Sequence, residues 1–351
     1  MGFDTLSAGF GVLIVSVPSP SGISLSGTVG HGNTVTLNVS SGFGVKDGDY
    51  SDKPLIWAPF ENPPSFDPSA LGGITSWQHV HPTWEFSSVT SPTNKTSVPR
   101  IYVDDSANDD GMDFAIFTAN GFDTFYMFAK RNFNYPITSG GVNDRNLKHH
   151  RWYNAADISG YPIYNNMYAC MRGAGQGSGV FPEQTSQYSS IDDAGYNYID
   201  PVIPSEQWVR EEVELKLSTL DGTDGEFRNW WGNTEECNIS DMRHRTTAIP
   251  GQYNLYYLQH YINQISRTDD TTMYCYLTDV YIDNSWCRVV AGNASTWAAC
   301  TEKEIQIPSA WADTAISITC NRGAWTSLTG KYLYVVLADG SLFSTDGYLL
   351  S

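Results

Sequence analysis

Short runs in which apolar and polar residues alternate follow one another along the chain, and this period of two predicts β-strands. In residues 34–39 every second position is apolar, and residues 316–320 repeat the pattern. Clusters rich in Gly, Asn and Asp, such as 108–111 and 221–225, separate the runs, as expected for turns. Between 57 and 290 we find no convincing amphipathic helix. The pattern therefore predicts an all-β protein.

The middle of the chain holds the longest series of such runs. They include residues 114–118, 124–130, 147–153, 208–217, 254–263 and 273–283. Many alternating strands separated by turns are typical of a sandwich of two antiparallel sheets.

Two segments of this region resemble the concanavalin A-like lectin/glucanase superfamily. Residues 207–217, followed by the Asp224-Gly225 turn and 226–231, are similar to one of its strand pairs, and 276–283 are similar to its final strand. The resemblance implies a concanavalin A-like jelly roll over residues 55–295. Lectins, glycosidases, polysaccharide lyases and inert structural modules share this fold, so the resemblance does not decide the function.

The two ends of the chain predict a second, smaller sandwich. Neither end has enough apolar strands to close a core alone, whereas 25–54 and 296–351 complement each other. The glycine turn, the alternating strand and the Gly42-Phe43-Gly44 motif resemble the opening of an IPT/TIG immunoglobulin-like domain, and Asp339-Gly340 marks a hairpin turn in its closing half. This resemblance implies an Ig-like anchoring domain that the jelly roll interrupts.

Residues 1–24 form an N-terminal arm containing an apolar strand at 12–17. The strand pairs either with a neighbouring subunit or with the chain's own sandwich, because a lone strand needs an edge. No basic residue precedes the short apolar run, so we recognise no secretory signal. No apolar run approaches the length of a transmembrane helix, so we expect no membrane insertion.

Composition narrows the classes of partner. The 351 residues exceed what one hydrophobic core usually fills, which favours two domains. The net charge of −18 argues against a nucleic-acid partner, because phosphate binding requires clusters of Lys and Arg. It also disfavours strongly anionic polysaccharides unless the fold creates a local basic patch. The six cysteines lack C-x-x-C spacing, and we expect most of them to be unpaired and buried.

Residues suited to sugar binding concentrate in a few strands, since aromatic rings cover the C–H-rich face of a sugar and planar polar groups bind its hydroxyls. The candidate glycan-binding residues are His149, Arg151, Trp152, Tyr153, Trp230, Trp231, Tyr257 and His260. Alternation places His149, Arg151 and Tyr153 on one face of their strand, and the opposing hypothesis is that this strand merely has one packed and one solvated face. Adjacent Trp230 and Trp231 must point to opposite faces.

Two enzymatic hypotheses compete with simple binding. Glu212 and Glu214 share a strand face and offer the paired carboxylates of a retaining glycosidase, or else form a solvated ladder with Arg210. Arg210 with Glu212 also resembles the Arg-x-Glu strand of alginate-lyase-like jelly rolls. Gln259 and His260 are adjacent, however, and depart from that family's Gln-x-His spacing. A lyase site would then consist of His260, Tyr257 and Arg151.

Metal sites are weakly indicated. Asp105, Asp109 and Asp110 form a calcium candidate in the densest carboxylate cluster, although the EF-hand spacing fails and a solvated turn is the alternative. His79 and His81 share a strand face but lack an evident third zinc ligand. We expect no other cofactor.

An interrupted Ig-like domain, an acidic surface and an apolar arm are similar to the features of bacteriophage virion proteins. This resemblance implies a non-enzymatic capsid-decoration or tail-associated adhesion protein on the virion surface or outside the cell. Its partners would be other virion proteins or copies of itself, and cell-surface glycans. The alternatives are a jelly-roll polysaccharide lyase or glycoside hydrolase, and a purely structural lattice protein.

Overall fold

The computed structural model describes most of the second half of the chain and separate strands of the first. The described residues are 22–40, 42–44, 46, 56–58, 74–78, 84–87, 98–103, 109–111, 115–134, 146–154, 164–172, 179–185, 189–190, 196–197, 203–247, 250–263 and 273–351. Within them the chain forms strands and one short 3₁₀ turn, η3 (Trp297–Ala299). The prediction of an all-β protein is confirmed.

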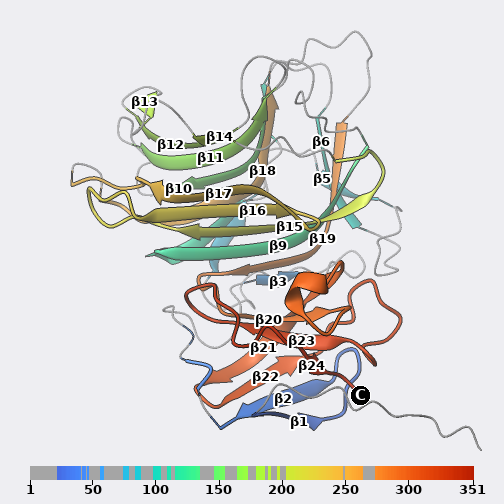
Figure 1. Ribbon diagram of the computed structural model, residues 1–351. Helices are drawn as coiled ribbons and strands as arrows, with labels where there is room; N and C mark the ends of the chain where they lie inside the picture. Colours follow the sequence, from blue (N-terminus) through green and yellow to red (C-terminus); the bar gives the residue numbers. More distant parts are fainter. Residues whose placement is uncertain are drawn as a thin grey trace, which may run out of the picture.

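One sheet has nine strands and forms the outer layer of a jelly-roll-like sandwich (Figure 1). Its order is β13 (Ser189–Ser190), β12 (Gly179–Thr185), β11 (Tyr164–Arg172), β10 (Asn146–Tyr153), β18 (Tyr253–Asn263), β8 (Ala115–Phe122) and β4 (Ile74–Gln78), with β14 (Tyr196–Asn197) beside β12 and β7 (Asp109–Gly111) beside β18.

The second sheet has eight strands and lies in the middle of the molecule. Its order is β17 (Thr234–Met242), β16 (Gly225–Trp231), β15 (Trp208–Lys216), β9 (Thr124–Phe133), β19 (Met273–Asp283), β6 (Val98–Val103) and β5 (Trp84–Ser87), with β3 (Ile56–Ala58) beside β19.

The third sheet, which we call the terminal sheet, has seven strands and combines the two ends of the chain. Figure 1 shows it as the blue and red layer below the eight-stranded sheet. Its order is β1 (Ile23–Gly27), β2 (Thr34–Val39), β22 (Ala315–Thr319), β21 (Lys303–Ala312), β20 (Arg288–Gly292), β23 (Tyr332–Val336) and β24 (Tyr348–Leu349).

Aromatic residues fill the space between the nine-stranded and the eight-stranded sheets. Trp152 of β10 and Tyr256 of β18 pack on Phe125 of β9, with ring centroids 5.8 and 4.6 Å apart. Trp152 also meets Phe227 of β16 at 5.9 Å. Each large apolar side chain buried in this way contributes about 1.5–3 kcal/mol to folding. Strands β10 and β18 are thereby fixed with one face inward and one face toward solvent.

Strand β9 is buried along almost its whole length because both of its faces are covered. Its Phe125 faces the nine-stranded sheet, whereas Tyr126 and Phe128 pack against Trp286 and Val290 of the terminal part of the chain. The eight-stranded sheet is thus the central layer of three.

The ends of the chain pair as the sequence predicts. Strand β2 lies antiparallel to β22, with Val35 opposite Ile318 and Leu37 opposite Ile316. All four side chains belong to one buried apolar cluster of the terminal sheet. The predicted turn at Asp339-Gly340 is present, with Gly340 at φ +79°.

Two details differ from the expected boundaries. Strand β20 lies within the range 55–295 expected for the jelly roll, but it pairs with β21 and β23 of the terminal sheet. Strand β1 begins at Ile23, inside the expected arm, and pairs with β2. The apolar strand expected at 12–17 lies outside the described residues.

The cysteines behave largely as expected. Those at 237, 275, 287, 300 and 320 have buried thiols and form no disulfide with one another, and the side chain of Cys170 lies outside the described part. Among the described residues no helix is long and apolar enough to span a membrane.

Candidate functional site

A β-bulge in β10 changes which side chains of this strand face solvent. The pairing register with β11 and with β18 shifts between Lys148 and His150. His149 and His150 are consequently both fully buried, as is Trp152. The prediction that His149 shares a face with Arg151 is wrong, because the bulge inserts a residue and breaks the alternation. His149 and Trp152 lie in the core, where a surface-bound sugar cannot contact them.

The buried histidines belong to a polar cluster centred on Glu211 of β15. The Glu211 carboxylate lies 2.5 Å from Arg131 Nε and 2.7 Å from His150 Nε2, and it accepts a hydrogen bond of 3.2 Å from Asn229. The other ring nitrogen of His150 lies 2.6 Å from the hydroxyl of Tyr256. Burial, aided by the Arg131 charge, holds the pKa of His150 well below its usual value. The imidazole is therefore neutral, and Arg131 supplies the counter-charge to Glu211.

Three of these side chains have a spacing that a metal ion could use. The candidate ligand atoms of His149, His150 and Glu211 lie within 4.8 Å of one another. The carboxylate already pairs with the Arg131 guanidinium, and that positive charge opposes a cation at the same oxygens. The cluster is best described as a buried ion pair with its hydrogen-bonding partners.

The outer face of the nine-stranded sheet presents a different set of side chains. Arg151 of β10 lies directly opposite Tyr257 of β18 in the antiparallel register. The Arg151 guanidinium sits 4.4 Å from the ring centroid of Tyr153, and the rings of Tyr153 and Tyr257 meet edge to face at 5.5 Å. All three side chains are partly exposed. We call Arg151, Tyr153 and Tyr257 the sheet-face site.

Several candidates fall outside the described side chains. His260 lies in β18, and Asp109 and Asp110 lie in β7, but their side chains are not among those described. Asp105, His79 and His81 lie outside the described residues altogether. The calcium site and the role of His260 stay predictions.

The tryptophan pair of β16 divides as the alternation predicts. Trp231 is buried against Phe133 and His149, with ring centroids 6.2 and 6.0 Å away. Trp230 is the partly exposed member and points to the opposite face of the eight-stranded sheet. Trp231 is thereby removed from the candidate glycan contacts.

The charged face of β15 is covered rather than solvated. Glu212 and Glu214 are almost fully buried beneath the terminal sheet. Glu212 pairs with Arg210 at 3.0 Å, and Glu214 pairs with Arg288 of β20 at 2.7 Å. The prediction that Glu212 and Glu214 form a solvated ladder with Arg210 is wrong. This polar face of β15 packs against the terminal sheet and is not exposed to solvent.

The same contacts speak against a glycosidase at this pair. Burial raises the pKa of Glu212, but Arg210 and Arg288 outweigh it and the pKa is lowered overall. A glycosidase requires one carboxylic acid that stays protonated near neutral pH, which means a raised pKa.

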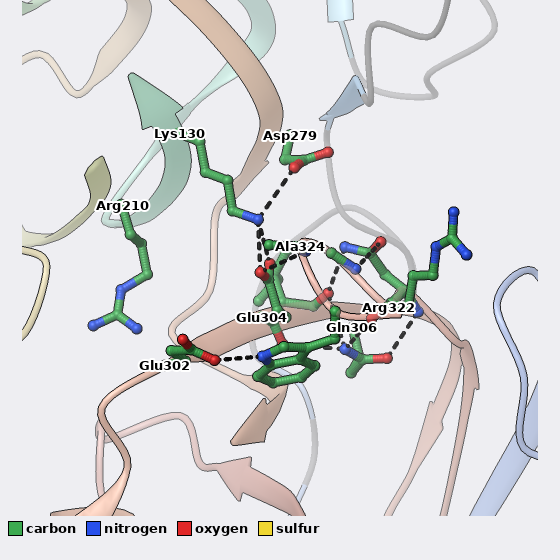
Figure 2. A network of polar contacts seen from close by, with 12 residues as sticks. Lys130, Arg210, Asp279, Glu302, Glu304, Gln306, Arg322 and Ala324 are labelled. Carbon is green, nitrogen blue, oxygen red and sulfur yellow. Dashed lines mark hydrogen bonds and ion pairs between the residues drawn. The ribbon is translucent and has the colours of Figure 1, made fainter. Parts of the chain in front are cut away.

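A second buried network ties the central sheet to the terminal sheet (Figure 2). Lys130 Nζ lies 2.7 Å from both carboxylate oxygens of Glu304 in β21, and 3.4 Å from the carboxylate of Asp279 in β19. The backbone N–H of Ala324 donates to Glu304 at 2.9 Å. Asp279 has a φ of 53°, which places this carboxylate at a bulge in β19. The contacts of Glu304 with Lys130 and Ala324 join the central sheet to the terminal part of the chain.

Solved structures of similar shape were found at low identity. The endo-β-1,4-glucuronan lyase of the fungus Trichoderma reesei is 7% identical, covers 66% of this chain and 95% of its own, and gives a TM-score of 0.42. The PL-14 alginate lyase of Aplysia kurodai is 12% identical over 65% of this chain and 98% of its own, with a TM-score of 0.43. A GH131 β-glucanase catalytic domain of Podospora anserina is 10% identical over 68% and 96%, with a TM-score of 0.36.

Identities this low concern the fold alone. No protein-family model matches the sequence, and no curated protein matches it. The three structures are two polysaccharide lyases and a glucanase, and none of them is a virion protein. They give no support to the prediction of a non-enzymatic virion decoration or adhesion protein, and we replace that prediction below.

Proposed function

We propose that the chain is a polysaccharide lyase that cleaves uronate-containing chains at the sheet-face site. The observation that carries this proposal is the pairing of Arg151 with Tyr257 on adjacent strands, with Tyr153 in contact with both. One cation, one phenol and one further aromatic ring then lie together on the solvent side of a rigid sheet. We also propose that this domain interrupts an Ig-like domain of IPT/TIG type, which the pairing of β2 with β22 supports.

The three side chains fit the needs of β-elimination. A uronate carboxylate withdraws electrons from the neighbouring C5–H bond more strongly once its charge is neutralised, and an Arg guanidinium binds a carboxylate through two parallel hydrogen bonds. A cation beside a phenol favours the phenolate, which is the form that accepts a proton. Arg151 would neutralise the substrate, and Tyr257 would act as the base.

The proposed step is balanced within these groups. The Tyr257 phenolate takes the proton from C5, the electrons of that C–H bond form the C4–C5 double bond, and the C4–O4 bond breaks. Tyr257 then returns the proton to the departing O4, so the enzyme ends in its starting state. Tyr153, whose ring lies against both partners, would pack against the sugar ring and hold the Arg151 side chain in place.

The test is an activity screen with matched variants. Polymannuronate, polyguluronate, polyglucuronate, polygalacturonate and a neutral β-glucan are incubated with the protein, and the ultraviolet absorbance of the C4–C5 double bond is followed together with reducing ends. We expect Tyr257→Phe to lower the elimination rate about 10²–10⁴-fold, the usual contribution of a positioned acid–base group. Arg151→Gln should also lower it. Tyr348→Phe, a partly buried tyrosine of β24, is the control and should retain full activity.

Either of two results contradicts the proposal. One is the absence of unsaturated product from every polyuronate tested. The other is the release of reducing ends from the neutral glucan without a double bond, which is the signature of a hydrolase.

A further inference from the structure

A pocket of about 310 Å³ lies between the eight-stranded sheet and the terminal sheet, on the far side of the central layer from the sheet-face site. We call it the interface pocket. Its charged and aromatic lining comes from β15, β16, β20, β21 and η3 and consists of Arg210, Glu212, Glu214, Arg228, Trp230, Arg288, Trp297 and Lys303. Four of these eight side chains are cationic in a chain whose net charge is −18.

The three arginines of the interface pocket each have a carboxylate partner. Arg210 Nε lies 3.0 Å from Glu212, Arg288 Nη2 lies 2.7 Å from Glu214, and Arg228 Nη2 lies 2.7 Å from Glu226. Glu226 lies outside the lining and also pairs with Lys216 at 3.0 Å, so it is shared between two cations. Lys303 is the fourth cation of the pocket.

Lys303 forms no ion pair with any carboxylate that the structure describes. Its ammonium lies 4.0 Å from the ring centroid of Trp297. Burial lowers the pKa of Lys303, and Glu212 acts in the opposite direction. The lining of the interface pocket therefore holds four cationic side chains and two carboxylates, those of Glu212 and Glu214, and an anion entering the pocket would stabilise the charged ammonium of Lys303.

The aromatic residues of the pocket suit a sugar ring. Trp230 of β16 and Trp297 of η3 are both partly exposed and both line the pocket. Indole faces pack on the C–H groups of a pyranose, while the nearby charged groups bind its polar substituents. The volume lies at the lower end of the range for small-ligand pockets, which favours one or two sugar units over a long chain.

We infer that the interface pocket is a second saccharide site that binds one acidic sugar unit, with its carboxylate at Lys303 and its ring beside Trp230 and Trp297. The choice of a uronate as that sugar rests on the proposed function, whereas the excess charge and the two indoles do not. A site there would hold a polyuronate close to the protein without taking part in bond cleavage.

The test compares ligands that differ only in the carboxylate. Binding of methyl β-glucuronide, of methyl β-glucoside and of sulfate is measured by calorimetry on the Arg151→Gln/Tyr257→Phe protein, in which the sheet-face site is disabled. We expect the glucuronide to bind at least tenfold more tightly than the glucoside or sulfate. Lys303→Gln should weaken glucuronide binding at least tenfold.

A matched control is available just before β23, at Lys331. Lys331 stacks on Trp325 at 4.6 Å, outside the interface pocket, so Lys331→Gln removes a similar lysine and should leave glucuronide binding unchanged. Trp297→Ala should weaken the binding of methyl β-glucuronide, whereas the binding of sulfate should not depend on Trp297.

Each contrary result has a distinct meaning. Equal binding of glucoside and glucuronide, equal binding of sulfate and glucuronide, or no effect of Lys303→Gln would each overturn the inference. A further result is that the wild-type protein shows no lyase activity while glucuronide binding still depends on Lys303. That result would support the interface pocket and refute only the proposed function.

Discussion

Replacing Glu211 by leucine should destabilise the protein severely, because this carboxylate holds the buried polar cluster together. Arg131 is fully buried and pairs with it at 2.5 Å, and His150 lies 2.7 Å from it. Removing one partner of a buried ion pair costs about 3–5 kcal/mol, since the remaining charge has no counter-ion. The loss of the acceptor at His150 costs about 1–3 kcal/mol more when counted alone. We expect Glu211→Leu to lose at least about 4 kcal/mol of a stability that is typically 5–15 kcal/mol.

A double variant separates the charge from the packing. In Arg131→Met/Glu211→Leu no unpaired charge remains, so more than half of the lost stability should return. Urea unfolding followed by tryptophan fluorescence and far-ultraviolet circular dichroism measures both variants. Glu235→Leu, which removes an exposed carboxylate from β17 of the same sheet, is the control and should change stability by less than about 0.5 kcal/mol. The reasoning is refuted if Glu211→Leu behaves like this control, or if the double variant is no more stable than the single one.

Two further predictions concern ionisation. Burial lowers the pKa of His244 to about 3, whereas the unfolded chain takes up the proton near pH 6.5. The stability that His244 contributes is therefore complete above pH 6.5 and is lost as the pH falls toward 3, by about 1.4 kcal/mol per pH unit. Urea titrations across this range should show that the free energy of unfolding depends less steeply on pH in His244→Gln than in the wild type, and equal slopes in the two proteins would contradict the assignment. Burial also raises the pKa of Cys237 and of Cys275 to about 12. Neither should react with iodoacetamide at neutral pH until urea is added, and rapid labelling of the native protein, read by peptide mass spectrometry, would show that the thiols are accessible.

Local alternation predicts a strand well where one face is apolar and no residue is inserted. Strand β16 illustrates this, because Phe227, Asn229 and Trp231 are buried while Arg228 and Trp230 are partly exposed. Its neighbour β15 carries the same signal in Val213 and Leu215, with Glu211 as the interruption. The period of two is set by the backbone itself, so it survives in the folded structure.

The details of the sites depend on information that alternation lacks. A single inserted residue turned His149 inward, and nothing in the sequence around 147–154 marks the bulge. In the sequence, Glu211 interrupts an otherwise apolar strand face. Its ion pair with Arg131 could not be predicted, because the two residues are far apart in sequence. Arg151 and Tyr257 were both candidates, but their direct opposition depends on the register between β10 and β18.

The pairing of β2 with β22 has a consequence for folding during protein synthesis. The hydroxyls of Thr36 and Ser317 lie 2.9 Å apart although they are 281 residues apart in sequence. During synthesis the hairpin of β1 and β2 is made before β22 and lacks this partner strand until residues 315–319 have been added. Unpaired strand edges are the common starting point of aggregation. The intervening sandwich can collapse during this interval, so its folding brings the last strands to the first.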